Sequence, residues 1–176
     1  MGKDKLLLDY NGKTLLDHSM DLLSSLPVFE RICVSAEERL CSIKGYENIK
    51  YYINPKPESG LSGSVHIGTK NAAGTHLLFL SADQPKLTEN DVLALIEAAK
   101  QNPDKIIFPQ IGKKPTSPTI FPVSFREELL SQKGDNGGRS IRDANKELCL
   151  PVTPVNPAHF TDIDNEADYR QAICYE

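Results

Sequence analysis

The chain has 176 residues, of which 39% are hydrophobic and 25% are charged, and its formal net charge is -4. A chain of this length suits one domain with a substantial core, so we expect residues 1–176 to form a single domain. The negative charge argues against nucleic acid as a partner, because binding a phosphate backbone needs a dense face of Lys and Arg. Without a membrane-length apolar run or a signal-like start, we expect a cytoplasmic protein that makes no membrane contact.

The cysteines and histidines do not have the spacing of a metal site. Four scattered thiols without a CxxC pair indicate reduced, structural cysteines. The four histidines form neither HxxxH nor HExxH, so a zinc site has little support.

Short apolar segments alternate with amphipathic ones along the chain, in the pattern of strands and helices. The strand-like segments are residues 6–10, 31–35, 49–53, 76–80, 105–109, 118–122 and 148–155. The expected helices begin after the caps Thr14, Ser64 and Thr88, cover residues 124–131 and 138–146, and close the chain from about Glu166. This order predicts an α/β fold with a mostly parallel sheet in three layers.

A carboxylate follows the apolar segment 76–80 almost at once, in Ser81-Ala82-Asp83-Gln84-Pro85. Ligands of open α/β sheets bind at the carboxyl ends of the strands, which favours a metal-binding role for Asp83. The alternative is a turn former or the cap of the next helix, but Thr88 is the better cap.

A second acidic segment lies near the C-terminus, where Asp162 and Asp164 flank Ile163. In an extended segment both carboxylates point to one side, with Ile163 toward the core. An N-cap pair for the last helix is the alternative. Together with Asp83 these acids indicate one shared Mg²⁺, because that ion takes one or two protein carboxylates plus phosphate oxygens.

Two loops rich in small residues, 54–64 and 134–139, suggest a polar ligand near helix starts, although plain turn chemistry has the same composition. Lys3, Lys5 and Lys13 make the start of the chain basic. These lysines are either a solvated face or include a phosphate-binding residue.

Seven short motifs occur in one order along the chain: residues 1–8 (MGKDKLLL), 11–16 (NGKTLL), 54–55 (NP), 60–64 (GLSGS), 82–85 (ADQP), 134–139 (GDNGGR) and 162–164 (DID). Together they resemble the molybdenum-cofactor nucleotidyltransferases, in particular their cytidylyltransferase-like branch. The resemblance covers nearly the whole chain, and the ordered set is far more specific than any single motif.

The resemblance implies a mononucleotide-binding fold, like that of the nucleotide-diphospho-sugar transferases, and an Mg²⁺-dependent enzyme. The phosphate of a molybdopterin-type cofactor attacks the α-phosphate of CTP or GTP and releases pyrophosphate, with CMP favoured over GMP. The implied catalytic residues are Asp83 and Lys5, and the implied metal ligands are Asp83 with Asp162 or Asp164. The implied nucleotide-binding residues are Asn54, Gly60, Ser62, Gly63, Ser64, Gln84 and Pro85, and the acceptor-binding residues are Gly134, Asp135 and Arg139.

The chain also departs from the family pattern. The resemblance implies an N-terminally truncated form, without the family's first strand and most of its Gly-rich loop, and makes residues 6–10 a segment after that loop. An open seam in the sheet would then favour aggregation or a homodimer. The alternatives are an inactive relative that binds nucleotide or pterin weakly, and a nucleotidyltransferase acting on a sugar or polyol phosphate.

Overall fold

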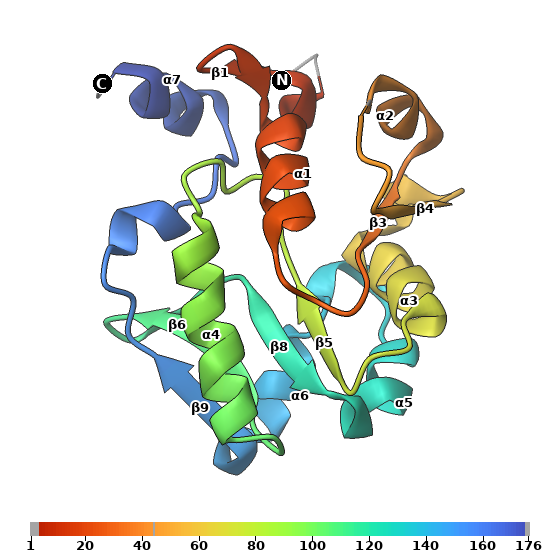
Figure 1. Cartoon of the computed structure of the whole chain (residues 1–176), viewed down its shortest axis with the longest axis vertical. Coiled ribbons are helices and arrows are strands. Elements are labelled where there is room, and N and C mark those ends of the chain that lie inside the picture. Colours follow the sequence, from red (N-terminus) through yellow and green to blue (C-terminus); the bar gives the residue numbers. More distant parts are fainter. Residues whose placement is uncertain (1–3, 44, 175–176) are drawn as a thin grey trace.

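The structure, a computed structural model, describes residues 4–43 and 45–174, without the side chains of Asn136 and Cys174. A five-stranded sheet forms its centre (Figure 1). The strands are β5 (His76–Phe79), β8 (Thr119–Pro122), β6 (Ile106–Ile111), β7 (Lys114–Pro115) and β9 (Cys149–Val152). The strand order is β5-β8-β6-β7, with β9 on the other side of β6.

The main strands of this sheet share one direction. β8 is antiparallel to both β5 and β6, so β5 and β6 run the same way, and β9 is parallel to β6. The α/β fold with a mostly parallel sheet is therefore confirmed, with β8 as an inserted antiparallel strand. The pattern of residues 118–122 predicted a strand but could not give its direction.

Side chains alternate between the two faces of the sheet and build the expected three layers. Ile106 and Phe108 pack with helices on one face, whereas Ile107 packs with a helix on the other. The helices of the first face are α3 (Leu61–Asn71), α5 (Arg126–Leu130) and α6 (Arg139–Ala144). Helix α4 (Glu89–Gln101) covers the opposite face and begins at a complete Thr88–Asp91 capping box.

A separate parallel pair, β3 (Ile32–Ser35) and β4 (Lys50–Ile53), lies beside the central sheet (Figure 1). Within the described residues β3 pairs only with β4, and β5 pairs only with β8. In the described part of the chain, each of β3 and β5 therefore keeps one edge without a strand partner, and we call these two edges the open seam. Both strands run toward the same end of the molecule in Figure 1.

The first described residues form a short 3-10 helix, η1 (Lys5–Leu7), and a hairpin of β1 (Asp9–Tyr10) and β2 (Lys13–Thr14). The prediction of one strand over residues 6–10 is therefore wrong. The Asp4 side chain accepts a hydrogen bond from the Leu6 N–H and caps a helical turn, which the apolar run did not reveal.

Two helices differ from the sequence prediction, while α1 (Leu15–Ser25) has the expected Thr14–Asp17 capping box. Helix α2 (Glu37–Ser42) was missed, because it has neither a capping side chain nor a buried residue. Helix α3 begins at Leu61 after an N-cap at Gly60, so Ser64 lies inside the helix and the predicted cap was wrong.

The C-terminal helix α7 (Glu166–Cys174) lies beside β1, so segments from the two halves of the chain pack together (Figure 1). The Tyr169 hydroxyl donates to the Asp9 carbonyl, and Tyr10, Leu15 and Ile163 form a small buried cluster between these segments. The ends of the chain thus support the carboxyl edge of the sheet.

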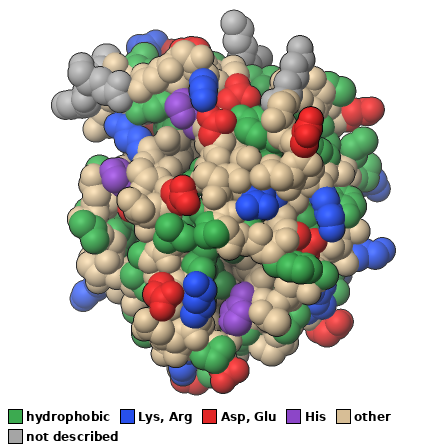
Figure 2. All heavy atoms as spheres, viewed as in Figure 1, with side chains coloured by type: hydrophobic (Ala, Val, Ile, Leu, Met, Phe, Trp, Pro, Cys, Tyr) green, Lys and Arg blue, Asp and Glu red, His purple; other side chains and the backbone are tan. Residues whose placement is uncertain are grey.

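The visible surface has no dominant charge. Lys, Arg, Asp and Glu side chains are interspersed over the face in Figure 2, without an extended basic patch there. Within the described residues, no helix combines the length and the apolar character that crossing a membrane requires.

Candidate functional site

An ion-pair cluster joins three distant parts of the chain at the carboxyl end of β5. The Lys5 ammonium lies 2.9 Å from Asp83 Oδ2 and 3.0 Å from Asp164 Oδ1. Asp83 is the more buried partner, with 16% of its side chain exposed against 66% for Asp164. We call Lys5, Asp83, Asp162 and Asp164 the acidic cluster.

Both the backbone and a neighbouring hydroxyl fix Asp83 in this cluster. Its carbonyl oxygen accepts a hydrogen bond from Ile163 N–H at 2.9 Å, which ties the end of β5 to the C-terminal segment. Its Oδ1 accepts from Ser81 Oγ at 2.6 Å, so Oδ2 remains to face Lys5. Ser81 had not been singled out, although its place two residues before the aspartate is the signal that could have identified it.

Asp162 and Asp164 do not cap the last helix, which was the alternative role for this pair. Asn165 Oδ1 accepts from the N–H groups of Ala167 and Asp168, so Asn165 caps the start of α7. Ile163 is 2% exposed and points into the core, as the alternation predicted. The two carboxylates are therefore available to the cluster.

Gln84 links Asp162 to the sheet. This side chain is buried, and its Nε2 donates to Asp162 Oδ1 at 2.8 Å and to the Phe160 carbonyl at 3.2 Å. A longer contact of 3.3 Å reaches the Ser117 carbonyl. Gln84 thus orients a carboxylate, and its expected contact with a nucleotide stays a prediction, as does that of the half-buried Pro85.

The cluster holds more negative than positive charge. Burial, followed by the charge of Asp83, raises the pKa of Asp162 above its ordinary value of 3.8. Partial burial alone would lower the pKa of Lys5, but the hydrogen bonds and charges of Asp83 and Asp164 outweigh it and raise that pKa. Asp83 and Asp164 contact the ammonium and Asp162 lies beside Asp83, so three carboxylates and one ammonium leave a net negative charge that favours a further cation.

The three aspartates of the acidic cluster are suitable ligands for a hard divalent cation, but they do not form a complete coordination site. Carboxylate oxygens are the ligands that Mg²⁺ and Mn²⁺ prefer. Within residues 4–43 and 45–174, however, no three Asp, Glu, His or Cys side chains converge as a metal site. The Lys5 ammonium takes the position between Asp83 and Asp164. A metal here would depend on additional oxygens, such as those of phosphates.

The first small-residue loop is organised by Asn54 at the carboxyl end of β4. Asn54 is 4% exposed; its Nδ2 donates to Ser64 Oγ at 3.0 Å, and its Oδ1 accepts from Lys56 N–H at 3.0 Å. A Cβ added to Gly63 would lie 3.2 Å from Asn54 Nδ2, so the helix start packs tightly on this side chain. Ser62 is buried in the same turn.

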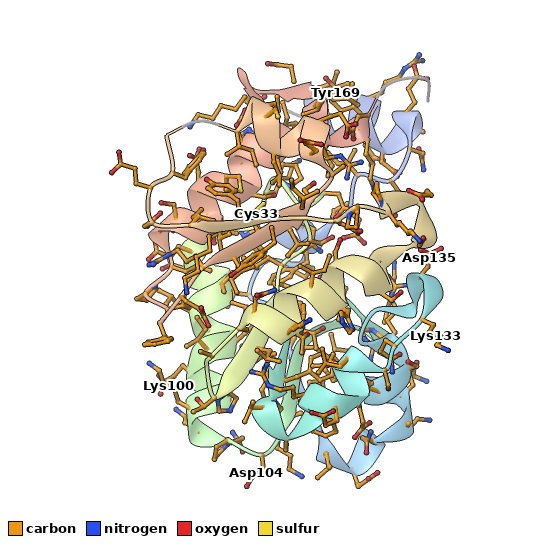
Figure 3. The ribbon with its side chains drawn as sticks, turned by 90° about the vertical axis from the view of Figure 1, so that its right-hand side faces the viewer. Cys33, Lys100, Asp104, Lys133, Asp135 and Tyr169 are labelled. Carbon is orange, nitrogen blue, oxygen red and sulfur yellow. The ribbon has the colours of Figure 1, made fainter. Side chains whose placement is uncertain are left out.

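The second loop docks on the first. Asp135 Oδ1 accepts from Leu61 N–H at 3.3 Å and so lies at the start of α3, where Figure 3 displays it. Gly60 has φ +96° and ψ 177°, and a Cβ there would come within 2.3 Å of Asp135 Oδ1 and 2.8 Å of the Gly134 carbonyl carbon. Arg139 is exposed and forms no hydrogen bond or ion pair with the described part of the chain.

The predicted site residues therefore form two groups. The acidic cluster unites Lys5 with the three aspartates, and the docked loops unite residues 54–64 with residues 134–139. No hydrogen bond or ion pair joins the two groups within the described residues. Sequence reasoning missed that Asp135 contacts the start of α3, and its expected role in acceptor binding stays a prediction.

An α/β sheet with polar side chains at the carboxyl end of a strand is typical of proteins that bind a small ligand at that edge. A family model described as the MobA-like NTP transferase domain matches residues 1–148. The chain belongs to this family of nucleotidyltransferases.

Individual relatives agree with the family. The chain is 26% identical over 152 residues to a probable molybdenum cofactor guanylyltransferase of Pyrococcus horikoshii, covering 84% of this chain and 75% of that protein. It is 29% identical over 166 residues to the corresponding Rhodopirellula baltica protein, covering 87% and 78%. A Mycobacterium tuberculosis protein solved as a manganese complex shares the fold, with a TM-score of 0.75, 17% identity, and coverage of 98% and 92%.

Replacing Gly60 with alanine tests the docking of the two loops. The φ and ψ of Gly60 lie in a region that is essentially restricted to glycine, so we expect Gly60→Ala to cost about 1–3 kcal/mol of unfolding free energy in urea. Gly112→Ala is the control, because Gly112 also has a positive φ but no atom within 4 Å of an added Cβ. Equal losses in the two variants would contradict tight docking.

The raised pKa of Asp162 gives a pH dependence with a defined sign. The folded chain binds the proton of Asp162 more tightly than the unfolded chain does, so this protonation stabilises the fold. The stabilisation is complete below the ordinary pKa of 3.8 and is lost as the pH rises through the pKa of the folded chain. Asp162→Asn keeps an acceptor for Gln84 and removes the charge. We expect this variant to be more stable than the parent at about pH 7, with the difference shrinking toward about pH 4. Urea unfolding across that range measures it, and a pH-independent difference would be the contrary result.

Proposed function

We propose that this protein transfers GMP from GTP to the terminal phosphate of a molybdopterin-type cofactor and releases pyrophosphate, with the help of Mg²⁺. The observation that carries the proposal is the meeting of Lys5, Asp83 and Asp164 at the carboxyl end of β5. This is the sheet edge where ligands of α/β proteins bind, in a chain of a nucleotidyltransferase family.

The residues have separate roles in this proposal. Asp83 with Asp162 or Asp164 would hold Mg²⁺, which when bound neutralises charge on the transferring phosphate. Lys5 supplies a positive charge for phosphate oxygens. The Asn54-organised turn with Gly60 and Ser62 to Ser64 would border the base and ribose, while Gly134, Asp135 and Arg139 would face the acceptor. Positioning and charge stabilisation suffice, without a covalent intermediate.

The choice of nucleotide changes from the sequence prediction, which favoured CMP over GMP. The curated relatives of Pyrococcus and Rhodopirellula are named as guanylyltransferases, and those names favour GMP. Magnesium likewise remains a proposal, since manganese is the metal in the related Mycobacterium structure. A reaction with GTP and CTP in parallel, with each metal in turn, separates these alternatives.

Asp83→Asn is the main test of the chemistry. Because the carboxylate faces Lys5 and not the core, we expect the variant to fold normally and to lose at least about 100-fold in pyrophosphate release with GTP, Mg²⁺ and molybdopterin. Circular dichroism and thermal unfolding check the fold. Normal turnover by Asp83→Asn would exclude the metal role of this residue.

Asp104→Asn is the matched control for charge removal. Asp104 is exposed and lies at the opposite end of the molecule from Tyr169 of α7 (Figure 3). The activity of the Asp104→Asn variant is therefore expected to stay at the parent level. No turnover by the parent with any nucleotide, despite nucleotide binding, would favour an inactive relative. Turnover only with a sugar or polyol phosphate would favour the other alternative.

We also propose that the chain self-associates as a homodimer through its open seam. β3 and β5 each have one edge without a strand partner within the described residues, and such edges readily pair with another chain. Light scattering coupled to gel filtration is expected to give twice the 19.5 kDa chain mass. A monodisperse monomer at all concentrations would contradict this proposal.

A further inference from the structure

Lys5 occupies the position between two of the carboxylates that the proposed function assigns to a metal. Its ammonium contacts Asp83 Oδ2 at 2.9 Å and Asp164 Oδ1 at 3.0 Å. Ser81 donates to the other oxygen of Asp83, Oδ1, at 2.6 Å and so keeps Oδ2 directed at the ammonium. A cation that binds both Asp83 Oδ2 and Asp164 Oδ1 would take the position of the ammonium and must displace it.

The backbone of Lys5 is held in place, whereas its side chain is free to change conformation. Its backbone lies in η1, which Asp4 caps at Leu6 N–H, and Asp4 in turn pairs with Arg39 of α2. A lysine side chain has a flexible four-carbon stem, so the ammonium can swing away without moving this anchored turn. Asp83 and Asp164 both contact this ammonium, so its departure leaves two neighbouring carboxylates without their counter-ion.

We propose that Lys5 is an internal counter-ion that holds Asp83 and Asp164 together before the metal binds, and that Lys5 and the metal exclude each other at these oxygens. The exchange prevents repulsion between the aspartates in the metal-free protein. It also frees the ammonium for nucleotide phosphates only after a divalent cation has arrived. This inference rests on the proposed function, because it needs a metal at the acidic cluster.

The exchange has a measurable consequence for metal binding. If Lys5 bridges Asp83 and Asp164 about 80% of the time, only the remaining protein can bind a metal at these oxygens. The apparent affinity for the metal is then lowered about fivefold. Removing the ammonium should therefore strengthen metal binding, which is the opposite of the effect expected for a residue that builds the site.

The test is titration of Mn²⁺ alone into nucleotide-free protein, followed by electron paramagnetic resonance of the unbound ion. Lys5→Met keeps the length of the stem and removes the charge, and we expect it to bind Mn²⁺ at least about fivefold more tightly than the parent. Lys5→Arg keeps the charge and should not gain affinity. Thermal unfolding should find Lys5→Met less stable than the parent without metal and restored by Mn²⁺.

Lys13→Met is the matched control, because exposed Lys13 pairs with Asp21 and with no residue of the acidic cluster. This variant should bind Mn²⁺ like the parent. Equal or weaker Mn²⁺ binding by Lys5→Met would overturn the exchange and leave the metal site intact. Failure of parent and Lys5→Met alike to bind Mn²⁺ would overturn the metal assignment of the proposed function, and the exchange with it.

Discussion

The hydrogen bond from Ile163 N–H to the Asp83 carbonyl is the contact on which the site depends. It fastens the C-terminal segment to the end of β5 and brings Asp162 and Asp164 to Asp83. The buried Ile163 side chain and the amide of Gln84 reinforce the same junction. Asp83 and the two C-terminal aspartates lie about half the chain length apart in sequence. Without this junction nothing would hold them close enough to interact electrostatically.

The junction also explains why a lysine from the start of the chain lies in the acidic cluster. The N-terminal hairpin and α7 pack against each other through Tyr10, Ile163 and Tyr169, so η1 is held next to the C-terminal segment. Carboxylates this close repel one another unless a cation lies among them. Lys5 provides that charge from within the chain, and a nucleotide-bound metal would provide it in the working enzyme.

A second constraint governs the docked loops. Gly60 adopts a backbone conformation that only glycine tolerates well, and the close approach of Asp135 and Gly134 leaves no room for a Cβ. Helix α3 consequently begins three residues before the predicted cap, with Asp135 from a distant loop bonded to its first N–H. The nucleotide-binding and acceptor-binding regions of the proposal are thus physically connected, although each was inferred from a separate motif.

The sequence by itself determined the features that depend on neighbouring residues. Capping boxes at Thr14 and Thr88, the apolar strands and the ordered family motifs are local, so the α/β class, most of the elements and the candidate residues could be predicted. The unrecognised α2 and the misplaced start of α3 have weak local signals, because no capping side chain of their own marks them.

Only the tertiary structure decided the direction of β8, the Asp135 contact with α3 and the placement of Lys5 between Asp83 and Asp164. These features depend on contacts between residues far apart in the chain. Their geometry is set by how layers pack, and no local pattern encodes it.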